Sequence, residues 1–181
     1  MKNANRLMVL MILLLAPPTV FQAQTQQAGQ EVSKPPIPNY LEFTPRIGTG
    51  GQPTEDGMKL IAEKGYKIII NIRSSSETFD IAAEEKQALQ LGLRYYMIPF
   101  VATEPSEEQA LAFDALLSAL KDNKVFVHCG SGNRVGSLMM IYLALEEGMA
   151  PDKAEQEARK IGLRAPNLLD FAKRVIASHK K

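Results

Sequence analysis

The fold is decided by one stretch of the sequence, Val125-Phe126-Val127-His128-Cys129-Gly130-Ser131-Gly132-Asn133-Arg134. Its apolar first half predicts a buried strand, and the small residues that follow predict a tight loop whose backbone N–H groups can turn inward around an anion. We expect a helix to begin near Arg134 and to bring its positive N-terminal end to the same point. Ligands of open parallel sheets bind beyond the carboxyl ends of the strands, and Cys129 stands at such an end.

Cys129 is the only cysteine among the 181 residues, so no disulfide can form within the chain. The helix terminus, the loop amides and the Arg134 guanidinium all favour the thiolate, which is the nucleophilic form of cysteine. Arg134 can also hold an oxyanion through two parallel N–H donors. We therefore interpret Cys129 as a nucleophile and residues 130–133 as an anion-binding loop. The alternative is a buried core thiol beside an ordinary turn.

The surrounding sequence predicts an α/β fold with a parallel central sheet that is flanked by helices on both faces. Lys67–Ile72 is a continuous β-branched run, which is typical of a strand buried on both sides. Arg94–Ile98 and Lys124–His128 are expected as further strands, and Phe43–Ile47 as a short extended stretch. Helices are expected from Thr54 to about Gly65, from Ile81 to Leu91, from Glu107 to Lys121, from Arg134 to Glu147, and onward from Pro151 and Pro166.

Three segments are expected along the chain. Residues 1–23 are interpreted as a signal peptide, because Lys2 and Arg6 precede the apolar run Leu7–Ala16 and small residues follow near Ala23. That run is shorter than the roughly 20 apolar residues of a membrane-spanning helix, so we expect no stable membrane anchor after cleavage. Residues 24–39 are rich in Gln and Pro and predict a disordered linker. Residues 40–181 then form one domain, in a periplasmic or secreted protein.

The charge balance of the chain excludes some partners. Cleavage after Ala23 would leave 19 basic and 20 acidic residues. This balance produces no positive electrostatic field that would attract nucleic acid. The chain has only the histidines His128 and His179, and no carboxylate cluster has metal-ligand spacing. We therefore expect no metal and no cofactor, and a small anionic or phosphorylated substrate as the partner.

These residues resemble the cysteine-dependent protein tyrosine and dual-specificity phosphatases, in which His-Cys, a glycine-centred loop and Arg lie between a strand and a helix. Upstream, Gly51-Gln52-Pro53 and Ile70-Asn71-Ile72-Arg73 look like the bacterial phosphatase-like family related to β-lactamase hydrolase-like proteins. The likeness covers roughly residues 43–163. It implies a phosphoester hydrolase with Cys129 as nucleophile, Arg134 as oxyanion clamp and His128 as the residue that orients the thiolate. It also implies that Arg73 and Glu77 line the opposite rim.

Two features depart from the phosphatase pattern. The spacing from Cys129 to Arg134 is Cys-x4-Arg, one residue shorter than Cys-x5-Arg, and Val135 stands where the pattern has a hydroxyl. Residues 99–104 contain no Asp to protonate a leaving group, so Glu77, Asp80 and Glu104 are the candidate acids.

The short loop leaves two other functions open. Cys129, Gly132 and Arg134 also fit the Cys-x-x-Gly-x-Arg loop of rhodanese-like sulfurtransferases, which need no leaving-group acid. A non-catalytic module that binds phosphorylated groups is the third reading. The upstream segments favour the phosphatase.

Overall fold

The computed structural model describes residues 34–179, so the predicted signal peptide and most of the predicted linker lie outside the described residues. The strands are β1 (Leu41–Glu42), β2 (Ile47–Gly50), β3 (Ile68–Asn71), β4 (Arg94–Met97) and β5 (Val125–His128). The helices are α1 (Glu55–Glu63), α2 (Ile81–Gln90), α3 (Glu107–Ala119), α4 (Asn133–Leu145), α5 (Pro151–Ile161) and α6 (Pro166–His179). Within residues 34–179, no helix is both long enough and apolar enough to cross a membrane.

The strands form one five-stranded sheet in the order β1-β2-β5-β3-β4. Strands β2, β5, β3 and β4 are parallel, which confirms the predicted central sheet. The edge strand β1 is antiparallel to β2 and was not predicted. A strand of two residues is too short to show an alternating hydrophobic pattern. Strand β2 begins where the expected extended stretch of residues 43–47 ends, and its two glycines weaken the strand signal in the sequence.

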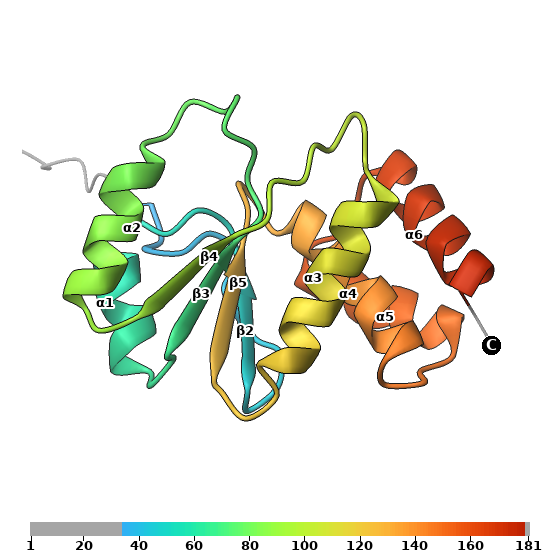
Figure 1. Ribbon diagram of the computed structural model, residues 1–181, viewed down its shortest axis with the longest axis horizontal. Helices are drawn as coiled ribbons and strands as arrows, with labels where there is room; N and C mark the ends of the chain where they lie inside the picture. Colours follow the sequence, from blue (N-terminus) through green and yellow to red (C-terminus); the bar gives the residue numbers. More distant parts are fainter. Residues whose placement is uncertain (1–33, 180–181) are drawn as a thin grey trace, which may run out of the picture. The chain divides into compact units, whose positions relative to one another are not determined.

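Helices cover both faces of the sheet, as the β-branched run of β3 predicts (Figure 1). One core joins Ile68, Ile70 and Val127 to helices α3 to α6, and a smaller core joins Ile69 and Phe126 to α1 and α2. Because successive strand residues point to opposite faces, the side chain of Cys129 lies on the side of the larger core. The side chain of His128 points the other way, toward α1 and α2.

The end of the predicted disordered linker is part of the fold. Ile37 is only 3% exposed and belongs to the smaller core. The backbone carbonyls of Pro36 and Pro38 accept hydrogen bonds from Thr54 N at 2.9 Å and Gly51 N at 2.6 Å. The prediction of disorder up to residue 39 was therefore wrong for these residues. Burial of one isoleucine and two backbone hydrogen bonds outweigh a composition that by itself predicts disorder.

Asp114 lies on the buried side of α3, and its Oδ1 atom has no hydrogen-bond partner among the described residues. Burial and the adjacent Glu146 carboxyl raise the pKa of Asp114 to about 7. Between about pH 4 and 7 the folded protein thus holds a proton that the unfolded chain releases, so the free energy of unfolding decreases as pH rises. The loss is at most about 1.4 kcal/mol per pH unit.

Asp114→Asn is expected to remove this loss, because the amide carries no charge at any pH in the window. Thermal unfolding from about pH 5 to pH 8 should show a shallower decrease in Tm for Asp114→Asn than for the unsubstituted protein. Asp122→Asn, at an exposed position just after α3, is the control. Equal slopes for both variants would show that Asp114 is ionised in the folded state throughout.

Candidate active site

A cavity of about 330 Å³ lies beyond the carboxyl ends of the central strands. Three loops form it, one after each of β3, β4 and β5, because parallel strands end at the same edge of the sheet. The lining residues are Ser74, Ser76, Glu77, Val101, Ala102, Thr103, Ser131, Asn133 and Arg134. The loop predicted to carry the chemistry therefore opens onto a cavity.

Cys129 directly follows β5, and its side chain is buried with 1% exposure. The backbone N–H of Gly132 donates to Cys129 Sγ at 3.1 Å, so the loop does turn an amide inward. Gly132 has φ +88°, and a Cβ there would lie 2.8 Å from the carbonyl oxygen of Ile161. Only glycine fits this position. Helix α4 begins at Asn133, one residue before the predicted start.

The loop is held from three directions by hydrogen bonds. Gly130 O accepts from the backbone N–H of Gln52 at 3.2 Å, and Ser131 O accepts from Asn39 Nδ2 at 2.9 Å. The side chain of Asn133 accepts from the backbone N–H groups of residues 164 and 165, at 2.8 and 3.2 Å. The Asn133 side chain therefore anchors the chain before α6 instead of facing an anion.

Arg134 and Glu77 form a two-pronged ion pair across the cavity. Arg134 Nη1 lies 2.5 Å from Glu77 Oε1, Nη2 lies 2.8 Å from Oε2, and Nη1 also donates to the carbonyl of Phe100 at 3.1 Å. The bond from Arg134 lowers the pKa of Glu77 to about 2 against the effect of burial, with help from the Ser74 N–H and Arg73. Burial alone would lower the pKa of Arg134, but Glu77 and the Cys129 sulfur outweigh it and raise that pKa.

Arg73 completes this rim. Its Nε donates to Glu77 at 3.0 Å and its Nη1 donates to Gln52 Oε1 at 2.7 Å, while the guanidinium lies 3.8 Å from the centre of the Phe79 ring. The structure thus brings together Arg73, Glu77 and Arg134. Two cations on one carboxylate leave a net positive charge at the cavity, which suits an anionic ligand.

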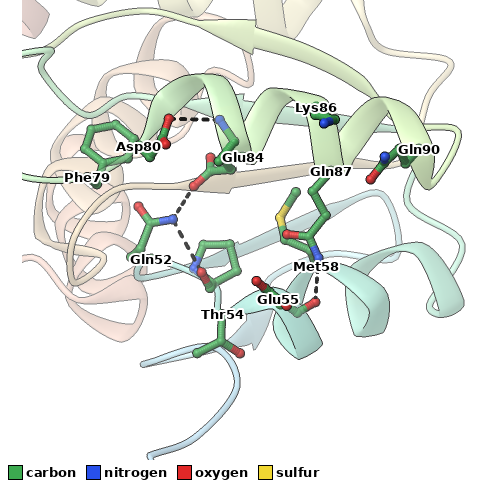
Figure 2. A pocket seen from close by; sticks show the side chains of 12 residues that line it. Gln52, Thr54, Glu55, Met58, Phe79, Asp80, Glu84, Lys86, Gln87 and Gln90 are labelled. Atoms are coloured by element: carbon green, nitrogen blue, oxygen red, sulfur yellow. Dashed lines mark hydrogen bonds between the residues drawn. The ribbon is translucent and has the colours of Figure 1, made fainter.

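The three candidate acids occupy different places. Glu77 is ionised and occupied by the two arginines, so it holds no proton near neutral pH. Asp80 caps α2 by accepting from Ala83 N at 2.9 Å, and it lines a separate cavity between α1 and α2 (Figure 2). Glu104 is exposed on the loop whose residues 101–103 line the site. Of the three, Glu104 alone follows the cavity-lining residues 101–103 and has no hydrogen bond or ion pair among the described residues.

His128 lies on the opposite side of the sheet from the thiol and contacts a residue that the sequence analysis did not select. Its buried Nε2 atom is 2.9 Å from Oε1 of Glu84 on α2, and Glu84 is only 7% exposed. Burial raises the pKa of Glu84, but His128, Gln52 and Tyr95 outweigh that effect and the pKa is lowered. Glu84 lies three residues after Ile81 and four residues before Ala88, so all three share one face of the predicted helix. An acidic residue on that apolar face is the sequence signal by which Glu84 could have been selected.

The sequence matches known proteins. The family described as "DSP-PTPase phosphatase fused to NAD+ Kinase" (PTP-NADK) matches residues 38–172. The "Beta-lactamase hydrolase-like protein" of Xylella fastidiosa is 30% identical over 118 residues, which are 64% of this chain and 27% of that protein. The chain thus spans about a quarter of the length of the curated relatives that it matches.

Solved structures show the same fold. A DUF442 protein of Shewanella putrefaciens has a TM-score of 0.69 and 25% identity, over 80% of this chain and 95% of its own. TpbA of P. aeruginosa has a TM-score of 0.62 and 18% identity, over 80% of this chain and 86% of its own, and it has been solved in complex with pTyr. The family match covers most of the described residues. The chain therefore belongs to the PTP-NADK family of dual-specificity and tyrosine phosphatase-like domains.

Proposed function

We propose that this phosphatase-like domain hydrolyses phosphate monoesters through a covalent intermediate on Cys129. The observation that carries the proposal is the position of Cys129 Sγ, which accepts the Gly132 N–H at the N-terminus of α4 and lies beside Arg134. Both contacts place a hydrogen-bond donor or a positive charge at the sulfur. The same amide and guanidinium can hold the oxygens of a phosphoryl group in the cavity, since Glu77 keeps Arg134 in place.

Two displacements make up the reaction. The Cys129 thiolate attacks phosphorus, the bond from phosphorus to the ester oxygen breaks, and the alcohol departs with a proton from an acid. Water then attacks the phosphocysteine and gives a proton to the carboxylate left by the first step, the S–P bond breaks, and inorganic phosphate leaves while the thiolate and the acid are restored. The charge of the transferring group stays near Arg134 in both steps, which is where stabilisation lowers the barrier.

We propose Glu104 as the acid of the first step, because Glu77 and Asp80 are engaged elsewhere. Glu104→Gln is expected to slow hydrolysis of an alkyl phosphate by about 100-fold and that of a nitrophenyl phosphate much less, since a nitrophenolate leaves without a proton. Steady-state rates on the two esters check this. Glu108→Gln, at an exposed position on α3, is the matched control. Equal losses on both esters would remove Glu104 from the role.

The substrate we propose is a small or phenolic phosphate ester such as phosphotyrosine. The cavity of about 330 Å³, the Arg73–Glu77–Arg134 rim and the pTyr complex of TpbA support this class. The direct experiment offers the purified protein an aryl phosphate and, separately, thiosulfate with an acceptor thiol. Phosphate release is expected. Thiosulfate turnover without phosphate release would favour the sulfurtransferase that Cys-x4-Arg also allows, and inactivity in both would favour a binding module.

We also propose that the protein is exported and that residues 1–23 are its signal peptide. The support is the sequence pattern of Lys2 and Arg6 before Leu7–Ala16 and small residues near Ala23. Intact-mass measurement of the protein recovered outside the cytoplasm is expected to give a first residue between about 24 and 29. A mass that retains Met1 would contradict export with cleavage.

A further inference from the structure

Glu84 is a buried carboxylate on which four side chains converge. It lies against His128 and accepts hydrogen bonds from Tyr95 Oη at 2.8 Å and from Asn71 Nδ2 at 3.1 Å. It also accepts from Gln52 Nε2, as Figure 2 shows. These groups come from the loop after β2 and from β3, β4 and β5. No lysine or arginine contacts Glu84 among the described ion pairs, so the hydrogen-bond donors of Gln52, Asn71 and Tyr95 stabilise its carboxylate. Burying a carboxylate costs desolvation free energy, which these hydrogen bonds offset. The resulting network restricts the positions of the side chains that contact Glu84.

One branch from Glu84 reaches the nucleophile. The 2.9 Å contact places His128 Nε2 against Glu84 Oε1, although the ring is not aligned for a straight hydrogen bond. The ring also stacks on Phe126, with centroids 6.3 Å apart. His128 immediately precedes Cys129, so a fixed imidazole fixes the peptide at which the anion-binding loop begins.

The other branch reaches the clamp. Gln52 donates to Glu84 through Nε2 and accepts from Arg73 Nη1 through Oε1 at 2.7 Å. Arg73 donates to Glu77, which holds Arg134. Gln52 also donates its backbone N–H to Gly130 O within the loop. One carboxylate on α2 therefore supports both the residue before the thiol and, through three side chains, the guanidinium opposite it.

We infer that Glu84 is a positioning residue of the active site, which holds the Cys129 loop through His128 and the Arg134 clamp through Gln52. This rests on the proposed function of Cys129 and Arg134. Glu84 touches neither in the structure, so its effect must travel through these two neighbours. Its carboxylate matters because Gln52, Asn71 and Tyr95 all donate to it, whereas a glutamine amide offers one acceptor oxygen and places its NH₂ against donors.

Glu84→Gln tests this without requiring turnover. Two readouts are used: the pH midpoint for alkylation of Cys129 by iodoacetamide, and the concentration of inorganic phosphate that halves the alkylation rate. We expect the midpoint to move up by roughly one pH unit, since a loosened loop stabilises the thiolate less. We expect the phosphate concentration that halves the alkylation rate to rise about tenfold, because a displaced Arg134 binds phosphate less tightly. Glu85→Gln, the exposed neighbour on the same helix, is the control and should match the unsubstituted protein.

The outcomes separate the explanations. An alkylation midpoint that moves down in Glu84→Gln would mean that Glu84 acts by its negative charge alone. A midpoint and a phosphate concentration equal to those of Glu85→Gln, with only a lower Tm, would mean a purely structural role. Either result overturns the inference. Gln52→Leu cuts only the clamp branch, so it should raise the phosphate concentration that halves alkylation and move the midpoint less than Glu84→Gln does, because the His128 branch is kept. If Glu84→Gln does not fold, Tyr95→Phe carries the midpoint measurement, and equality with the control then overturns the inference. Failure of the proposed function appears separately, as no turnover in the unsubstituted protein.

Discussion

Cys129→Ser is expected to abolish hydrolysis of an aryl phosphate, with kcat falling by about four orders of magnitude or more. A serine hydroxyl fits the space of the thiol but is a much weaker acid and nucleophile than a thiol, so it stays protonated and cannot take over the attack. Steady-state phosphate release, measured with protein whose Tm matches that of the unsubstituted chain, gives the answer.

The same variant should still bind inorganic phosphate, since the loop amides and Arg134 remain. Isothermal titration with phosphate checks that the cavity is intact when turnover is lost. Turnover that persists in Cys129→Ser would exclude nucleophilic catalysis by this residue. It would leave the binding loop without a covalent role.

Arg134→Lys is expected to lower kcat/KM by about 100- to 1,000-fold, although the positive charge is kept. An ammonium group cannot donate in parallel to both oxygens of Glu77 and also reach the Phe100 carbonyl, as the guanidinium does. The lysine would therefore lie out of register with the oxygens of the transferring group. The kinetics should show most of the loss in kcat, because the interaction strengthens in the transition state.

Arg159→Lys is the matched control for this substitution. Arg159 makes a similar pair with Glu155 through Nε at 3.0 Å and Nη2 at 2.7 Å, on the exposed side of α5. Its loss should leave kcat/KM unchanged, since exposed pairs contribute little to stability. If Arg134→Lys behaves like this control, the planar two-pronged geometry at position 134 has no catalytic value.

The sequence predicted the sheet around the site because the physical signals there are local. The β-branched residues of β3 must be buried on both faces, and Val125–His128 leads into glycines that permit a tight turn. The same reasoning located Cys129 and Arg134, since loop amides, a helix terminus and a guanidinium attract an anion wherever they meet. Strand β1 could not be predicted in this way, because it has only two residues and its pairing with β2 depends on the tertiary structure and not on a local pattern.

The supporting side chains of the site were harder to predict because their partners are distant in sequence. Glu84 and His128 are separated by 44 positions and meet only when α2 packs on the sheet. The hydroxyl of Tyr95 likewise contacts Asn71 and Glu84, which lie 24 and 11 positions away in the sequence. Glu77 was a candidate acid until the structure placed it on Arg134, and that contact decides its charge.

The shortened Cys-x4-Arg loop is compatible with the phosphatase fold of the chain. Helix α4 starts at Asn133, so Arg134 stands in its first turn and reaches Glu77 across the cavity. Gly132 has a positive φ, and its amide reaches the sulfur within three residues of Cys129. The family match over residues 38–172 shows that the chain belongs to the PTP-NADK family although its loop has this spacing.

The most direct test of the account is to trap the covalent intermediate. The protein is mixed with an aryl phosphate, quenched in acid within the first turnovers, digested, and the peptide that contains Cys129 is weighed. The account predicts one added phosphoryl group on Cys129, with no such adduct in Cys129→Ser. Phosphate release without any adduct on Cys129, or an added sulfur after thiosulfate with no adduct from the phosphate ester, would contradict it.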